Sequence, residues 1–80
     1  MTPDQKLAFE LGTRMMQIRR LLPPSWQLDV CLQAHGIAFV RLIDADGTDR
    51  YEEPHDIGEH PTMMLVLMGL DRCLEILEGL

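Results

Sequence analysis

The spacing of the apolar residues changes at a pair of prolines, Pro23 and Pro24, and this change constrains the fold more than any other feature of the sequence. Before the prolines, apolar residues recur every three or four positions, as on one face of an α-helix: Leu7, Leu11, Met15, Ile18 and Leu22. A Thr-x-x-Gln capping box begins at Thr2, and Pro3 suits the first helical turn. Because neither later proline can continue the helical hydrogen-bond ladder, the sequence predicts a helix over residues 3–22.

After the prolines, apolar and polar residues alternate, which is the pattern of a β-strand with one buried face. The apolar members of this alternation are Trp26, Leu28, Val30 and Leu32. We therefore expect a first strand over residues 26–33. Residues 37–44 are apolar on both faces, apart from Arg41, and this predicts the central strand. A hairpin turn at Gly47 then leads to a polar third strand, residues 48–53, which we expect at the edge of the sheet.

The helical period returns over residues 61–80, where Pro61 suits the first turn. The core-facing residues that we expect in this second helix are Met63, Val66, Leu67, Leu70, Leu74 and Leu77. A chain of 80 residues is long enough for one domain. The sequence therefore predicts a single α+β domain, residues 1–80, in the order α-β-β-β-α, with both helices on one face of a three-stranded antiparallel meander.

The acidic residues are concentrated around the last hairpin and the loop that follows it. Residues 44–59 contain seven acids and one base, so this segment accounts for the whole net charge of −6. Such a segment attracts basic surfaces and speeds their encounter. We expect it to bind a partner through eight residues: Asp44, Asp46, Asp49, Tyr51, Glu52, Glu53, Asp56 and Glu59. Tyr51 is expected to be an exposed anchor among the carboxylates. The alternative is an edge strand that its charge keeps soluble.

The helices carry more apolar residues than one core-facing stripe requires. The surplus residues are Phe9, Met16, Met64, Met68 and Ile76. A helix that is apolar around its whole circumference must be covered on more than one side. These residues predict a homodimer or partner surface, in which methionines adapt to the partner's shape. The alternative is ordinary helix–helix packing with scattered surface hydrophobes.

The motifs of catalysis are missing from the sequence. Every glycine is isolated, so there is no glycine-rich phosphate loop. Thr62 follows His60 closely, but it lies in no strand–turn–helix elbow and has no evident orienting acid. We therefore expect no enzymatic activity and no cofactor.

Two segments invite a metal-binding interpretation. The alternating carboxylates of residues 44–49 resemble a calcium loop, but glycine comes fourth and His55 twelfth, where an EF-hand needs a sixth glycine and a twelfth glutamate. We therefore interpret this segment as a hairpin turn. His55 and His60 are five residues apart on an expected loop, which is not the spacing that places two imidazoles on one helical face. A metal-binding protein that uses these histidines remains an alternative.

The order helix–strand–strand–strand–helix resembles that of double-stranded RNA-binding domains, which bind phosphates through lysines at the start of their second helix. Residues 59–64 occupy that position and contain no lysine. The arginines are dispersed, and a net charge of −6 repels phosphate at long range. The resemblance is therefore one of topology, and we expect no direct binding of nucleic acid.

The two cysteines, Cys31 and Cys73, are too few for the disulfide framework of a small secreted domain. The N-terminus lacks a basic segment followed by an apolar core, so we expect no secretory signal. The longest apolar run, residues 63–68, is six residues long and too short to span a membrane. These features predict a cytoplasmic protein that does not bind membranes.

The function that we expect is that of a small acidic protein-binding module, acting as an inhibitor or adaptor. Its acidic segment would occupy a basic surface of a larger protein, in the manner of a nucleic-acid mimic. Small phage-encoded antagonists of host defence complexes, anti-CRISPR proteins among them, are similar in size and charge. The alternatives are a homodimeric structural or assembly protein and the metal-binding protein mentioned above.

Overall fold

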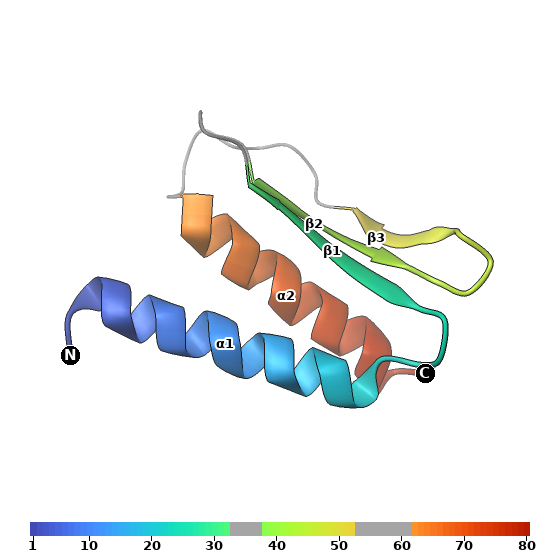
Figure 1. Ribbon diagram of the computed structural model, residues 1–80, viewed down its shortest axis with the longest axis horizontal. Helices are drawn as coiled ribbons and strands as arrows, with labels where there is room; N and C mark the ends of the chain where they lie inside the picture. Colours follow the sequence, from blue (N-terminus) through green and yellow to red (C-terminus); the bar gives the residue numbers. More distant parts are fainter. Residues whose placement is uncertain (33–37, 53–61) are drawn as a thin grey trace.

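The computed structural model describes residues 1–32, 38–52 and 62–80, and its elements follow the predicted order (Figure 1). Its helices and strands are α1 (Pro3–Leu21), β1 (Gln27–Leu32), β2 (Ala38–Ile43), β3 (Asp49–Glu52) and α2 (Thr62–Glu78). The described ends that can be compared differ from the predicted ones by one or two residues, and four predicted ends lie outside the described residues: Gln33, Ile37, Glu53 and Pro61. The α-β-β-β-α fold class is confirmed.

Local interactions fix both ends of α1. The Thr2 hydroxyl accepts a hydrogen bond from the Gln5 backbone N–H at 3.1 Å, and the Gln5 side-chain oxygen accepts one from the Thr2 N–H at 2.9 Å. The predicted capping box is therefore present. At the other end, Leu22 is extended, as a residue before a proline prefers. A turn closed by a 3.1 Å bond from the Trp26 N–H to the carbonyl of Pro23 then leads into β1.

β2 is the central strand, as predicted, and it pairs antiparallel with β1 on one side and β3 on the other. Leu42 lies opposite Leu28 in β1 and opposite Tyr51 in β3. The pairing with β3 then shifts, because Ile43 lies opposite Asp49 and leaves Arg50 as an extra residue. Such a β-bulge bends an edge strand and interrupts its hydrogen-bond ladder.

Both helices lie on the same side of the sheet, and α2 is the inner one. It packs against β2 and β3, while α1 packs on α2 and runs in the same direction along it (Figure 1). The centre of the core is formed by six side chains that are almost completely buried: Ile18, Val40, Leu42, Val66, Leu70 and Cys73. α2 is therefore the element that connects the sheet to α1.

Two residues that the helical stripes predict to be buried are exposed. Met15 and Met63 are 40% and 38% exposed, whereas Leu65 and Cys73, which the predicted stripe omits, are buried. Met63 borders a hollow of about 330 Å³ that also involves Leu7 and its neighbours in α1, so the two helices do not close over it. The buried arc of α2 is also wider than one stripe, because the sheet covers one side of the helix and α1 another.

Candidate functional site

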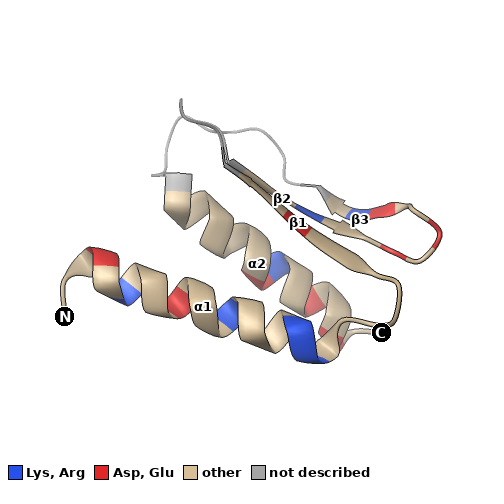
Figure 2. Ribbon diagram, in the orientation of Figure 1, with Lys and Arg blue, Asp and Glu red and all other residues tan. Residues whose placement is uncertain are grey.

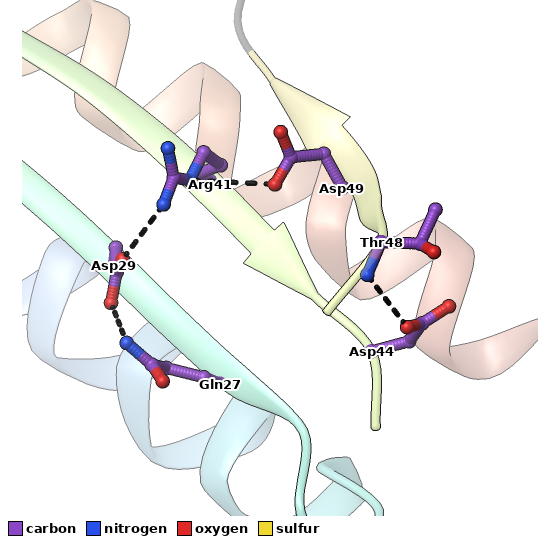
Figure 3. Close-up of polar contacts among 6 residues, drawn as sticks. All are labelled: Gln27, Asp29, Arg41, Asp44, Thr48 and Asp49. Atoms are coloured by element: carbon purple, nitrogen blue, oxygen red, sulfur yellow. Dashed lines mark hydrogen bonds and ion pairs between the residues drawn. The ribbon is translucent and has the colours of Figure 1, made fainter. Parts of the chain in front are cut away.

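The β2–β3 turn is held in one shape by the side chain of Asp44. Its Oδ1 atom accepts hydrogen bonds from the backbone N–H groups of Asp46 and Thr48, at 2.9 and 3.0 Å (Figure 3 draws the second). The Asp44 N–H donates to the Thr48 carbonyl at 2.9 Å, and the Gly47 N–H donates to the Asp44 carbonyl at 3.0 Å. Gly47 has a φ of 81°, a backbone conformation that glycine adopts without strain. The turn is therefore fixed by bonds within its own residues.

The carboxylate of Asp44 stabilises this turn and is little exposed to a partner. The side chain is only 12% exposed, and its Oδ2 atom lies 3.6 Å from Nη1 of Arg50. The Thr48 N–H holds the pKa of Asp44 below its usual value, with smaller contributions from the Asp46 N–H and Arg50, while partial burial opposes the shift. Asp44 is therefore a positioning residue of the hairpin.

An ion-pair row crosses all three strands on the face of the sheet that points away from the helices. Nη2 of Arg41 lies 3.6 Å from Oδ2 of Asp29, and Nε of Arg41 lies 3.5 Å from Oδ1 of Asp49 (Figure 3). Gln27 donates a 2.6 Å hydrogen bond to the other oxygen of Asp29. All three charged side chains are more than a third exposed, so each pair is screened by water. Arg41 therefore offsets part of the negative charge of Asp49.

The structure brings three of the predicted partner-binding carboxylates together on the β2–β3 hairpin, Asp44, Asp46 and Asp49 (Figure 2). Asp46 is exposed in the turn itself, between the two strands. The other predicted carboxylates are not placed, because Glu53, Asp56 and Glu59, together with the side chain of Glu52, lie outside the described residues.

Tyr51 is less exposed than the sequence predicts. It is only partly exposed and packs against the hydrophobic core, because its position opposite the buried Leu42 turns it toward the helices. Arg50, for which the sequence pattern predicts no role, has two partners. Its guanidinium lies 5.3 Å from the centre of the Trp26 ring, in addition to its pairing with Asp44. No local pattern predicts this, since it depends on the bulge in β3.

The surplus apolar residues of the helices do not form one surface. Phe9 and Met16 are 67% and 60% exposed, and Met64 and Met68 are also exposed, whereas Ile76 is half-buried against the core. On α1, Phe9 and Met16 are about half a turn away from the buried Leu11 and Ile18, so they point away from α2. The body of α1 therefore separates them from the exposed methionines of α2.

A partly exposed ion pair joins the two helices near their middle. Nε of Arg14 in α1 donates a 2.8 Å hydrogen bond to Oδ1 of Asp71 in α2. This hydrogen bond and the charge of Asp71 raise the pKa of Arg14. The pair therefore adds a polar link to the apolar packing between α1 and α2.

No group of three or more His, Cys, Asp or Glu side chains within residues 1–32, 38–52 and 62–80 could hold a metal ion. The calcium-like segment is a hairpin turn, as predicted, and the oxygen of Asp44 faces backbone N–H donors. The three histidines, His35, His55 and His60, lie outside the described residues.

Neither helix, over its described residues, is long and apolar enough to cross a membrane. The fold and the surface define a small α+β domain with an acidic hairpin at one end of its sheet. Compared with protein-family models, curated proteins and solved structures, the chain matches none of them.

Proposed function

We propose that this domain is a protein-binding module that docks its acidic hairpin onto a basic surface of a larger protein. The observation that carries the proposal is the charge distribution: the whole net charge of −6 comes from residues 44–59, and the described part of that segment forms an exposed hairpin. The Asp44 hydrogen bonds order the turn before any partner arrives, which lowers the entropic cost of binding.

The kind of partner follows from the same charge. A basic surface on a protein is often one that binds nucleic acid, and carboxylates on a rigid hairpin can occupy it in place of phosphates. The module would then act as an inhibitor or adaptor. Its two cysteines form no disulfide, which suits the reducing cytoplasm that we propose as its location.

The test is capture of a partner from lysate by the wild type and by two charge-reversal variants. Asp46→Lys/Asp49→Lys replaces two acidic side chains of the hairpin with basic ones. Glu75→Lys/Glu78→Lys makes the same change in net charge at exposed positions of α2. We expect the hairpin variant to lose a partner that the α2 variant keeps. We also expect association of the wild type to slow by on the order of 10-fold or more as salt rises.

Two outcomes would contradict this proposal. Equal loss by both variants would mean that net charge alone drives capture, and retention by the hairpin variant would place the binding site elsewhere. Urea unfolding of each variant, compared with the wild type, shows whether a loss of capture reflects a loss of fold.

A second candidate, an assembly protein that pairs through α1, is favoured by the exposure of Phe9 and Met16. Large exposed side chains on one face of a helix are typical of a docking surface. Phe9→Asp would then abolish a dimer that the wild type forms in sedimentation, and a Phe9→Asp protein that remains dimeric would exclude this surface.

A further inference from the structure

Within residues 1–32, 38–52 and 62–80, β1 is an edge strand, and it has few of the features that prevent an edge from pairing with another strand. It is six residues long, and the register with β2 is regular along its whole length. Its sequence, Gln-Leu-Asp-Val-Cys-Leu, contains one charge and no proline. Natural sheets protect an exposed edge with lysines, prolines, bulges or very short strands. The outer side of β1 therefore presents backbone N–H and C=O groups to any strand that fits.

The side chains of β1 are also incompletely covered. Leu28 and Val30 point toward the helices and pack against the core, yet both remain partly exposed. The reason is that α2 lies over β2 and β3, away from this edge. An open hollow of about 690 Å³ lies beside β1 and β2 and is lined by Leu28, Asp29, Val30 and Cys31 of β1 and by Phe39 and Arg41 of β2. An added strand would cover apolar surface as well as backbone groups.

The charges point to a second copy of this chain as the occupant. Two chains of net charge −6 repel each other wherever their acidic segments meet. The described acidic side chains of those segments, Asp44, Asp46 and Asp49, lie at the hairpin and at the start of β3, on the opposite edge of the sheet. The single charge on β1, Asp29, is already paired with Arg41 at 3.6 Å. The β1 edge is therefore where two copies can approach with the least repulsion.

The order of residues in β1 suits antiparallel pairing with itself. A two-fold axis through Val30 pairs Val30 with its own copy, Leu28 with Leu32, and Asp29 with Cys31. No like charges lie opposite each other in this register. Centring the axis on Asp29 instead would place two carboxylates face to face, which destabilises a sheet.

We propose that two copies of this chain pair antiparallel through β1, with the two-fold axis at Val30, and join their three-stranded sheets into one of six strands. The acidic hairpins then lie at the two far ends of the joined sheet. This inference goes beyond the proposed function and does not depend on it, since the dimer forms whether or not the hairpins bind a partner.

The first test is sedimentation of the wild type and of Val30→Lys, which places two lysines against each other on the axis. We expect the wild type to sediment at twice the 9.2 kDa mass of the chain and Val30→Lys to sediment as a monomer. A wild type that is monomeric at every concentration overturns the proposal. So does a Val30→Lys protein that remains a dimer.

The second test does not depend on how Val30→Lys folds. Asp29→Cys places a thiol opposite Cys31 of the other copy, and the Cα separation of about 4.5–5.5 Å in an antiparallel pair suits a disulfide. The control is Asp46→Cys, which puts the new thiol at the exposed hairpin turn. On a non-reducing gel after mild oxidation, we expect covalent dimer from Asp29→Cys far in excess of the control. Equal amounts from both variants overturn the proposal.

Discussion

β1 and β3 flank the same central strand, but their outer sides differ in length, charge and regularity. β3 has four residues, DRYE, of which three are charged, and a bulge at Arg50 interrupts its pairing. β1 has six residues with one charge and pairs without interruption. Charge and a bulge are features that keep an edge strand from adding a neighbour, and here they occur on one edge. Under the two proposals above, the edges would serve different contacts: β3 faces solvent or a basic partner, and β1 pairs with another strand.

The largest expected effect tests whether one buried side chain of β2 stabilises both edge strands. Leu42 is fully buried and lies opposite Leu28 of β1 and Tyr51 of β3, so Leu42→Ala should loosen both edges. We expect a loss of about 2–5 kcal/mol in the free energy of unfolding, measured in urea. Amide exchange should speed up in β1 and β3 alike.

The matched control is Ile43→Ala, the next residue of β2, which is only partly buried. It removes a similar side chain from the other face of the same strand and should cost less. If the two variants cost the same, or if only one edge loses protection in Leu42→Ala, the edges do not share this anchor.

A smaller effect compares the turns that lead into the two edge strands. Gly47, before β3, and Ser25, before β1, both have positive φ angles, 81° and 69°. A Cβ at Gly47 would meet no atom within 4 Å, so Gly47→Ala adds backbone strain alone. The strain costs about 1–2 kcal/mol and the lost unfolded-state entropy of glycine offsets about 0.5–1 kcal/mol of it, so we expect a net destabilisation below about 1.5 kcal/mol.

Ser25→Gly should have the opposite sign. It relieves the same strain, but glycine adds about 0.5–1 kcal/mol of chain entropy in the unfolded state, so the net gain is below about 1.5 kcal/mol. Urea midpoints of the two variants measure both effects. If Ser25→Gly destabilises as much as Gly47→Ala, the backbone at Ser25 carries no strain that glycine relieves.

The smallest effect is the loss of stability that we expect at the β3 edge when the pH is lowered. The Thr48 N–H, above all, holds the pKa of Asp44 below its unfolded value of about 3.9. A carboxyl with a lowered pKa stabilises the fold fully above its unfolded pKa, and this stabilisation disappears as the pH falls through the folded pKa. On acidification from about pH 4, amide protection should therefore fall in β3 before it falls in β1.

Asp44→Asn keeps an acceptor oxygen for the turn but cannot ionise, so we expect its stability to vary less with pH in this range. Asp44→Ala loses the acceptor as well and should be less stable than Asp44→Asn at every pH. An Asp44→Asn protein with the acid unfolding profile of the wild type would exclude Asp44 as the group responsible.

The order of elements could be predicted from the sequence because its signals are local. The capping box at Thr2, the two prolines and the glycine of the hairpin each act within a few residues. β2 was predictable as the central strand because both of its faces are apolar. These features depend on neighbours in the chain and not on how the layers meet.

The errors arise where contacts between layers decide the outcome. The helical stripe predicts that Met63 is in the core, but α1 and α2 do not close over it. The acidic neighbours of Tyr51 predict an exposed side chain, but its position opposite Leu42 turns it inward.

The candidate site divides in the same way. That acidic residues cluster at the hairpin is visible in the sequence, because they are consecutive along the chain. Two other features depend on strand register and on the bulge in β3. Asp44 holds the turn, and Arg41 and Arg50 offset part of the negative charge of the hairpin. Periodicity contains no information on either.

The inner position of α2 has a consequence for the order in which the chain can fold. The three strands are close in sequence, so their hairpins close quickly, but the element that covers them comes after all of them. α1, the first element, packs on that same helix, so it cannot dock until α2 has been added. The Arg14–Asp71 hydrogen bond between them joins residues 57 positions apart. Contacts of such long range slow folding, because the entropy of closing the loop is lost before they form. Docking of α2 is therefore the step that completes the fold, and until it occurs the apolar face of the meander remains open to other chains.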